Sequence, residues 1–144
     1  MIVSQILKSK ADIGVISVKA DASVSEAVGI LSEKRIGTVV VSEDGASLDG
    51  ILSERDIVRE MGKRGVACLA EPVSAIMTAK LVTCSPEDTA DKVLEMMTIG
   101  RFRHLPVMEN GAMVGLISIG DVVKARLSEL SMEKDALQGM IMGH

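Results

Sequence analysis

Apolar residues follow two spacings along this 144-residue chain, short continuous runs and runs at helical intervals. The β-branched run Val15–Val18 predicts a strand. Ser23 then precedes a segment in which Ala27, Ile30 and Leu31 recur at helical spacing, with Glu26 placed to complete a capping box. We therefore expect an amphipathic helix over Val24–Lys34.

A hairpin and a second helix follow. The predicted strands Thr38–Val41 and Leu48–Leu52 flank Asp44-Gly45, a favoured turn pair. Ser53 can cap a helix from Glu54 to about Gly62. Together with the preceding elements, this gives the order β-α-β-β-α.

The same pattern returns later in the chain. The offset is 66 residues up to the hairpin, from Gly45 to Gly111, and 65 after it, from Asp56 to Asp121. Self-similarity at a fixed offset indicates two copies of one supersecondary unit. We expect an α/β (α+β) fold of two packed β-α-β-β-α repeats with pseudo-two-fold symmetry, repeat 1 over 1–66 and repeat 2 over 67–127. The matching segments are a strand at Leu81–Cys84, a helix capped by Thr89 with Val93, Met96 and Met97 inward, and strands Leu105–Met108 and Met113–Ile117 around Asn110-Gly111.

Segments outside the repeat pattern have their own predictions. Gly62–Glu71 has the composition of a linker, and Val73–Met77 is predicted to be a short entry helix, echoed by Val3–Leu7. From Val122 onward, with 128–144 as an extension beyond the repeats, an amphipathic helix carries an apolar seam at Val123, Leu127, Leu130, Leu137 and Ile141, interrupted by Lys134. This helix either caps the core of its own subunit or forms a dimer.

Composition narrows the function. The chain is 47% hydrophobic but only 1% aromatic, so its core must be aliphatic. A net charge of -4 and the lack of aromatic platforms argue against nucleic acid as a partner. Cys68 and Cys84 suggest neither a disulfide framework nor a metal site. No apolar run reaches membrane-spanning length and the start of the chain lacks a signal pattern, so we expect a cytoplasmic protein without a membrane anchor.

Each repeat ends its hairpin with the pattern Ser-x-x-Asp, at Ser53–Asp56 and at Ser118–Asp121. Such a pattern often forms a capping box at a helix start. It also suits a ligand, because a hydroxyl and free amides at a helix N-terminus attract phosphate and a carboxylate accepts bonds from ribose hydroxyls. Asp is shorter than the Glu or Gln that closes a capping box best, which favours the second interpretation.

Two further segments accompany these corners, Ile76-Met77-Thr78 before Leu81-Val82-Thr83 and the stretch Arg103-His104-Leu105-Pro106-Val107. With them, the chain resembles the CBS-domain family over about residues 3–127. Two such repeats form the pair called a Bateman module. The resemblance implies an adenosine nucleotide in the cleft between the repeats, with Asp56 and Asp121 on ribose and Ser53 and Ser118 on phosphate. It also implies adenine held by the segments 12–16 and 78–82.

The resemblance further implies that Arg103 and His104 face phosphate. Repeat 1 has Gly37 and Thr38 there, with Arg55 as a possible substitute, so we expect unequal sites and a stronger one at Asp121. Alternatively, Arg101 and Arg103 are only a solvated rim. The predicted nucleotide-binding residues are Asp12, Ile16, Thr38, Ser53, Arg55, Asp56, Thr78, Leu81, Val82, Arg103, His104, Ser118 and Asp121.

The predicted function is a stand-alone, non-catalytic regulatory module that forms a homodimer and signals to an unknown effector protein. AMP is the first ligand candidate, with ATP, ADP, NAD(H) and S-adenosylmethionine as others, and no metal or catalytic cofactor is expected. Ser118, His104 and Asp121 form the one combination that resembles a catalytic triad, but no nucleophile-elbow pattern surrounds Ser118. The alternative is a ligand-independent dimerisation or interaction module whose corners are only helix caps.

Overall fold

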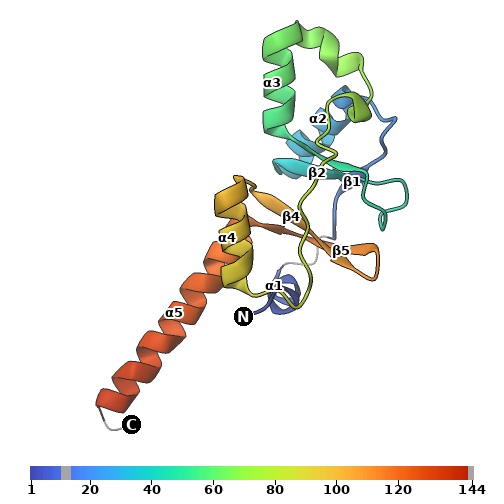
Figure 1. The fold of residues 1–144 in the computed structure, drawn as a ribbon. Helices are drawn as coiled ribbons and strands as arrows, with labels where there is room; N and C mark the ends of the chain where they lie inside the picture. Colours follow the sequence, from blue (N-terminus) through green and yellow to red (C-terminus); the bar gives the residue numbers. More distant parts are fainter. Residues whose placement is uncertain (11–13, 143–144) are drawn as a thin grey trace. The chain divides into compact units, whose positions relative to one another are not determined.

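The computed structural model describes residues 1–10 and 14–142, and it confirms the mixed α+β class (Figure 1). The described residues form two compact units, one of 14–82 with 110–114 and the other of 1–10, 83–109 and 115–142. In chain order the elements are α1 (Val3–Ser9), β1 (Ser17–Val18), α2 (Val24–Lys34), β2 (Thr38–Val41), β3 (Gly50–Ser53), α3 (Glu54–Arg64), η1 (Gly65–Ala70), η2 (Val73–Ala75), α4 (Ala90–Gly100), β4 (His104–Glu109), β5 (Ala112–Ser118) and α5 (Ile119–Ile141).

The unit built around repeat 1 contains a three-stranded sheet of order β1-β2-β3. Strand β1 pairs in parallel with β2, with Val18 opposite Val41, and β2 pairs antiparallel with β3. All four residues of β2 are buried, which fits its run of three valines after Thr38. Helix α2 has the predicted bounds, and Ser23 Oγ accepts the Glu26 amide at 3.1 Å.

The loop between β2 and β3 differs from the predicted tight hairpin. The predicted strand from Leu48 begins only at Gly50. Asp44 Oδ1 accepts the amides of Ala46 at 2.9 Å and Ser47 at 2.7 Å, so a side-chain-stabilised turn occupies the loop. These bonds lower the pKa of Asp44 to about 2.

Repeat 2 shows the same pairing with a shorter first strand. The predicted strand Leu81–Cys84 is wrong, because only Cys84 pairs, through a parallel bridge to Val107. This bridge lies 66 residues after the Val18–Val41 pair of repeat 1. The turn between β4 and β5 is the predicted Asn110-Gly111, where both residues have positive φ, 52° and 80°.

Each unit has its own aliphatic core. In the first, α2, the sheet, α3, η2 and the residue after η2 contribute the buried residues Val18, Val24, Ala27, Leu31, Val39, Val41, Leu52, Ile57, Val73 and Ile76. In the second, α1, the bridge residue Cys84, α4, β4, β5 and the start of α5 contribute Val3, Ile6, Cys84, Ala90, Val93, Met97, Leu105, Val107, Ile117, Val122 and Ala125.

The entry segments exchange places between the repeats. In the second unit, Ile2 pairs with Thr89 and the Val3 amide donates to the Asp88 carbonyl at 2.9 Å, so α1 packs on repeat 2. In the first unit, Ser23 pairs with Pro72, and η2 packs on repeat 1. The units of packing therefore differ from the repeat boundaries, and the division at residue 66 stays a prediction.

Two further predictions need correction. The segment Gly62–Glu71 is not an irregular linker, because α3 continues to Arg64 and η1 follows with Cys68 buried. The predicted entry helix Val73–Met77 is a single 3-10 turn at η2. The C-terminal helix α5 begins at Ile119 and continues without a break at residue 128.

Candidate functional site: the two Ser-x-x-Asp corners

Both Ser-x-x-Asp corners form complete capping boxes. In the first, the Ser53 amide donates to Asp56 Oδ2 at 2.9 Å, and the Asp56 amide donates to Ser53 Oγ at 3.3 Å. In the second, the corresponding distances for Ser118 and Asp121 are 2.9 Å and 3.1 Å. Asp is therefore long enough to close the box, and the sequence argument based on its length is wrong.

The backbone places the preceding loop against each corner in the same way. The Glu54 amide donates to the Gly37 carbonyl at 2.9 Å, and the Ile119 amide donates to the Arg103 carbonyl at 2.8 Å. The residue before β2 or β4 thus lies at the first turn of the following helix. In repeat 1 this residue is Gly37, and a Cβ there would lie 3.4 Å from the Glu54 carboxylate.

The Asp56 corner is closed by contacts within its own unit. The Asp56 residue is 6% exposed. Its Oδ1 accepts from Arg59 Nη2 at 2.8 Å and from the Thr78 hydroxyl at 3.5 Å, while Oδ2 accepts from Ser53. Thr78 is fixed by two backbone bonds with Ile51, at 2.9 Å and 2.8 Å. Both carboxylate oxygens are engaged, so a ligand hydroxyl would have to displace one of these donors.

The Asp121 corner is more open and lies beside more cations. Its side chain is 23% exposed, and Lys10 Nζ contacts Oδ2 at 2.8 Å. The same ammonium donates to the Leu116 carbonyl at 2.9 Å, which fixes it over the corner. Within the described residues, Asp121 Oδ1 accepts no hydrogen bond. That oxygen is therefore open to a ligand donor.

Charges at this corner shift two pKa values. Burial opposes ionisation of Asp121, but the Lys10 ammonium and the Ser118 donors outweigh it and lower the pKa of the carboxyl. The pKa of His104 is lowered, first by burial and then by the positive charges of Lys10 and Arg103, against the opposing effect of Asp121. His104 therefore lies close enough to sense the same charges as the carboxylate, and its neutral form is favoured in the free protein.

The structure groups most predicted site residues by unit. Thr38, which is buried, pairs with Ser53 across the β2–β3 ladder, and Asp56 and Thr78 complete that group. Arg103, His104, Ser118 and Asp121 form the second group.

The remaining predicted residues contribute less. The Ile16 carbonyl accepts the Val40 amide at 3.1 Å, and its side chain packs on the core. Arg55 is exposed on the first turn of α3. Leu81 and Val82 lie outside the helices and strands, with Val82 39% exposed. Asp12 lies outside the described residues.

Sequence reasoning missed two cations at the corners, Lys10 and Arg59. Arg59 lies three residues after Asp56 on α3, a spacing at which side chains on a helix meet. The signal for Lys10 was weaker, because it reaches Asp121 only through the packing of α1 on repeat 2. No residue spacing near Lys10 in the sequence indicates that α1 packs on repeat 2.

Other chemistry finds little support in the part of the chain that is described. No cluster of three or more His, Cys, Asp or Glu residues could hold a metal there. Burial raises the pKa of the Cys84 thiol to about 11, which removes its nucleophilic form at neutral pH. Ser118 Oγ accepts the Asp121 amide as a cap does, which gives no support to a nucleophilic role. No helix within 1–10 and 14–142 has both the length and the apolar character needed to cross a membrane.

The fold and the duplicated corners define a tandem α+β module with two similar polar sites. Its sequence matches the CBS domain model twice, over residues 4–63 and 73–128. The chain therefore belongs to the CBS-domain family, whose proteins are generally regulatory and non-catalytic.

Relatives with known sequences or structures agree with this assignment. The chain is 35% identical to the mitochondrial CBS domain-containing protein CBSX3 of Arabidopsis thaliana, over 98% of this chain and 72% of that protein. A crystal structure of a CBS-domain protein from Agrobacterium tumefaciens is similar with a TM-score of 0.82 and 45% identity, covering 88% of this chain and 99% of the other.

Crystal structures of more distant proteins contain ligands. CBSX2 in complex with AMP is similar with a TM-score of 0.74 and 24% identity, over 88% of this chain and 96% of that one. The CBS domain pair of protein MJ0100, in complex with 5'-methylthioadenosine and S-adenosyl-L-methionine, has a TM-score of 0.76 and 22% identity, over 90% and 98% of the two chains. At these identities the similarity concerns the fold.

Proposed function

We propose that this protein is a regulatory module that binds an adenosine-containing nucleotide, with the Asp121 corner as its stronger site. The observation that carries the proposal is the composition of that corner: a half-buried carboxylate with one open oxygen, next to Lys10, Arg103 and His104. A carboxylate accepts ribose hydroxyls, and neighbouring cations hold phosphate. The AMP complex of CBSX2 supports the ligand class, since it has the same fold.

The charges at the corner favour phosphate-bearing ligands among the candidates. S-adenosylmethionine carries a cationic sulfur and no phosphate, so Lys10 and Arg103 would repel it. AMP, ADP, ATP and NAD(H) each bring phosphate to the same cations. We therefore place AMP first and S-adenosylmethionine last. That Leu81 and Val82 hold adenine stays a prediction from the family resemblance.

Binding would act by population shift. A ligand that binds one conformation of the module more tightly than another changes their ratio, and an effector protein can recognise the favoured one. The module would do this as a homodimer in the cytoplasm. Exposed apolar side chains on the helices of the second unit support self-association, among them Ile99 on α4 and Leu127 on α5, which are 75% and 62% exposed.

The alternative function is a ligand-independent interaction module. The two complete capping boxes favour it, because each Asp already has a structural role. The two functions make different predictions for thermal stability, since a ligand that binds only the folded state stabilises it by mass action.

Thermal unfolding with and without AMP, ATP, NAD and S-adenosylmethionine separates these functions. The proposal predicts a higher melting temperature with millimolar AMP, a smaller effect or none with S-adenosylmethionine, and loss of the AMP effect in Asp121→Ala. Asp56→Ala is the matched control and should retain a shift. A melting temperature unchanged by all four compounds in the unmodified protein would support the interaction module instead.

A further inference from the structure

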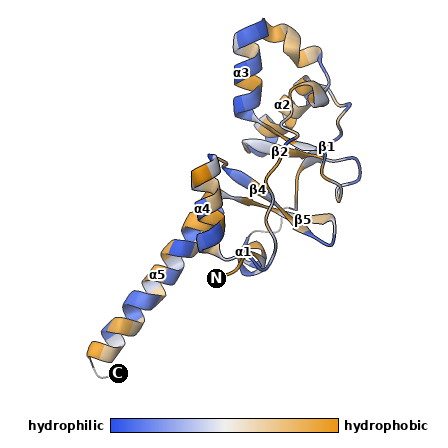
Figure 2. Cartoon of the chain, viewed as in Figure 1, coloured by the Kyte–Doolittle hydropathy of each residue, from blue (hydrophilic) through white to orange (hydrophobic). Residues whose placement is uncertain are grey.

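Helix α5 carries an apolar stripe, most of it beyond the buried start of the helix, with no cover in the described part of the chain. Only Val122 and Ala125 of this helix are buried, both near its start. Beyond them Leu127, Leu130 and Leu137 are 62%, 49% and 59% exposed. Figure 1 shows this part of α5 extending beyond α4, and Figure 2 shows apolar and polar segments alternating along it.

Helical geometry separates this stripe from the buried face. At 3.6 residues per turn, the stripe residues share a face about 130° from the one that carries the buried Val122 and Ala125. Their spacings of four and three are those of a and d positions in a coiled coil. The stripe consists of Val123, Leu127, Leu130, Lys134, Leu137 and Ile141, with Lys134 at an a position. Fifteen helical residues without tertiary support are marginally stable in water, so this half needs a partner.

We infer that the partner is the same stripe of a second copy, packed antiparallel. The inference rests on the proposed self-association and adds its surface and orientation. In an antiparallel pair centred at residue 132, an a position faces a d position in every layer. Leu127 then faces Leu137 of the second copy, and Val123 faces Ile141. The stripe is complementary to itself, with no position left over.

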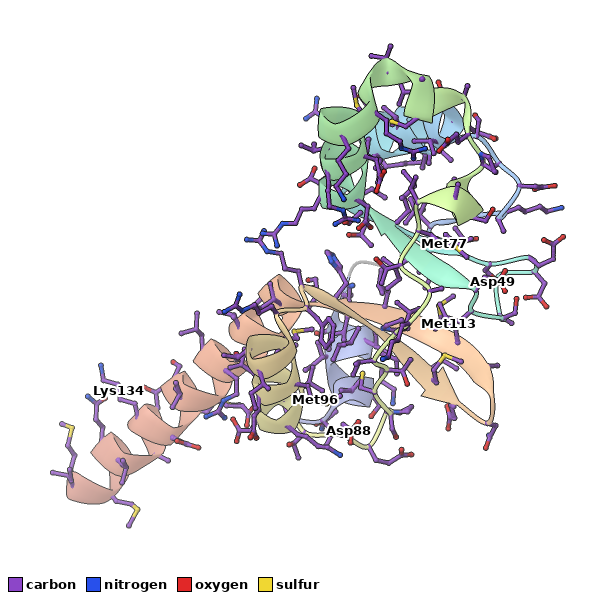
Figure 3. All side chains as sticks on the ribbon, turned by 45° about the horizontal axis from the view of Figure 1, so that its top comes forward. Asp49, Met77, Asp88, Met96, Met113 and Lys134 are labelled. Atoms are coloured by element: carbon purple, nitrogen blue, oxygen red, sulfur yellow. The ribbon has the colours of Figure 1, made fainter. Side chains whose placement is uncertain are left out.

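Lys134 determines the orientation. In a parallel pair it would face Lys134 of the second copy, and like charges in contact repel. In the antiparallel pair it faces Leu130 and lies beside Glu133 of the second copy, an opposite charge. Figure 3 shows the Lys134 side chain on the free part of α5. A polar residue at an a position is a known means of selecting one register at a cost in stability.

Sedimentation of single variants tests the surface. Leu130→Lys should weaken self-association by at least about tenfold, the equivalent of about 1.4 kcal/mol. Met132→Lys is the matched control, since Met132 is 57% exposed but lies on the opposite face of α5. Neither side chain belongs to the buried core, so both variants should keep their fold.

Spin labels at Gln138→Cys test the orientation, because the native Cys68 and Cys84 are buried and remain unlabelled. The antiparallel pair separates the two labelled positions by about 18 Å along the helix axis, whereas a parallel pair places them side by side. A monomeric unmodified protein would refute self-association itself. Equal association of Leu130→Lys and Met132→Lys would refute only this surface, and labels side by side would refute the orientation. Nucleotide binding is independent of all three outcomes.

Discussion

Replacing each corner aspartate by alanine should rank the two variants one way for the loss of stability and the other way for the loss of AMP binding. Asp56 is almost fully buried and accepts bonds from Ser53, Arg59 and Thr78. Asp121 is more exposed, and Lys10 can turn to water once the carboxylate is gone. We therefore expect Asp56→Ala to destabilise the protein more, and Asp121→Ala to weaken AMP binding more.

The magnitudes follow from the contacts. Loss of a capping side chain costs about 1 kcal/mol, which applies to both variants. Asp56→Ala also removes the acceptor of Arg59, whose side chain is 50% exposed, and of the exposed Thr78, which adds about 0.5–1 kcal/mol. The expected losses of unfolding free energy are therefore about 1.5–2 kcal/mol for Asp56→Ala and about 1 kcal/mol for Asp121→Ala.

Urea unfolding followed by circular dichroism measures these losses, and titration calorimetry with AMP measures binding. Ser23→Ala is the matched control, because Ser23 caps α2 with the same bond to an amide but belongs to no predicted site. It should cost about 1 kcal/mol and leave binding unchanged. A larger loss of stability in Asp121→Ala than in Asp56→Ala would refute the reasoning, as would equal effects of both on AMP affinity.

Three other predictions concern local packing and titration. Gly50→Ala should make the first unit unfold at a lower urea concentration than in the unmodified protein, because the new Cβ would lie 2.8 Å from the Thr78 carbonyl. Gly29→Ala is the control, since its Cβ meets nothing within 4 Å, and it should stabilise the folded protein by about 0.5–1 kcal/mol. Cys84 should resist alkylation by iodoacetamide at pH 8 until denaturant is added, and fast modification of the folded protein would contradict its raised pKa. The pKa of His104 is lowered in the folded state, so the unfolded chain takes up the proton at a higher pH than the folded protein does, and the unfolding free energy should fall as pH drops below 6.5. His104→Gln should weaken this pH dependence in urea unfolding between pH 7 and pH 5. The same pH dependence in the variant and the unmodified protein would contradict the prediction.

Local patterns predicted most of the elements, because their causes are local. Helix α2 has its predicted bounds, since Ser23 and the spacing of Ala27 and Leu31 act within a few residues. The Asn110-Gly111 turn formed as expected for the same reason. The strand at Leu81–Cys84 failed, because a strand exists only through its partner and only Cys84 finds one.

The site was harder to predict where it depends on tertiary packing. The corners themselves were located from their spacing, but Lys10 reaches Asp121 only because α1 packs on the other repeat. Thr78 reaches Asp56 through the equivalent exchange, by its bridge to Ile51. The two corners differ in burial and in the cations beside them. Which of them holds a ligand stays a prediction.

The central claim is that the Asp121 corner binds nucleotide and does not only cap α5. Calorimetric titration of AMP into the unmodified protein and into Asp121→Asn tests it most directly, since Asn keeps the size and capping ability of Asp but removes its charge. The account predicts saturable heat at one stronger site in the unmodified protein and a large loss of affinity in the variant. No heat in either protein, or equal affinity in both, would contradict it.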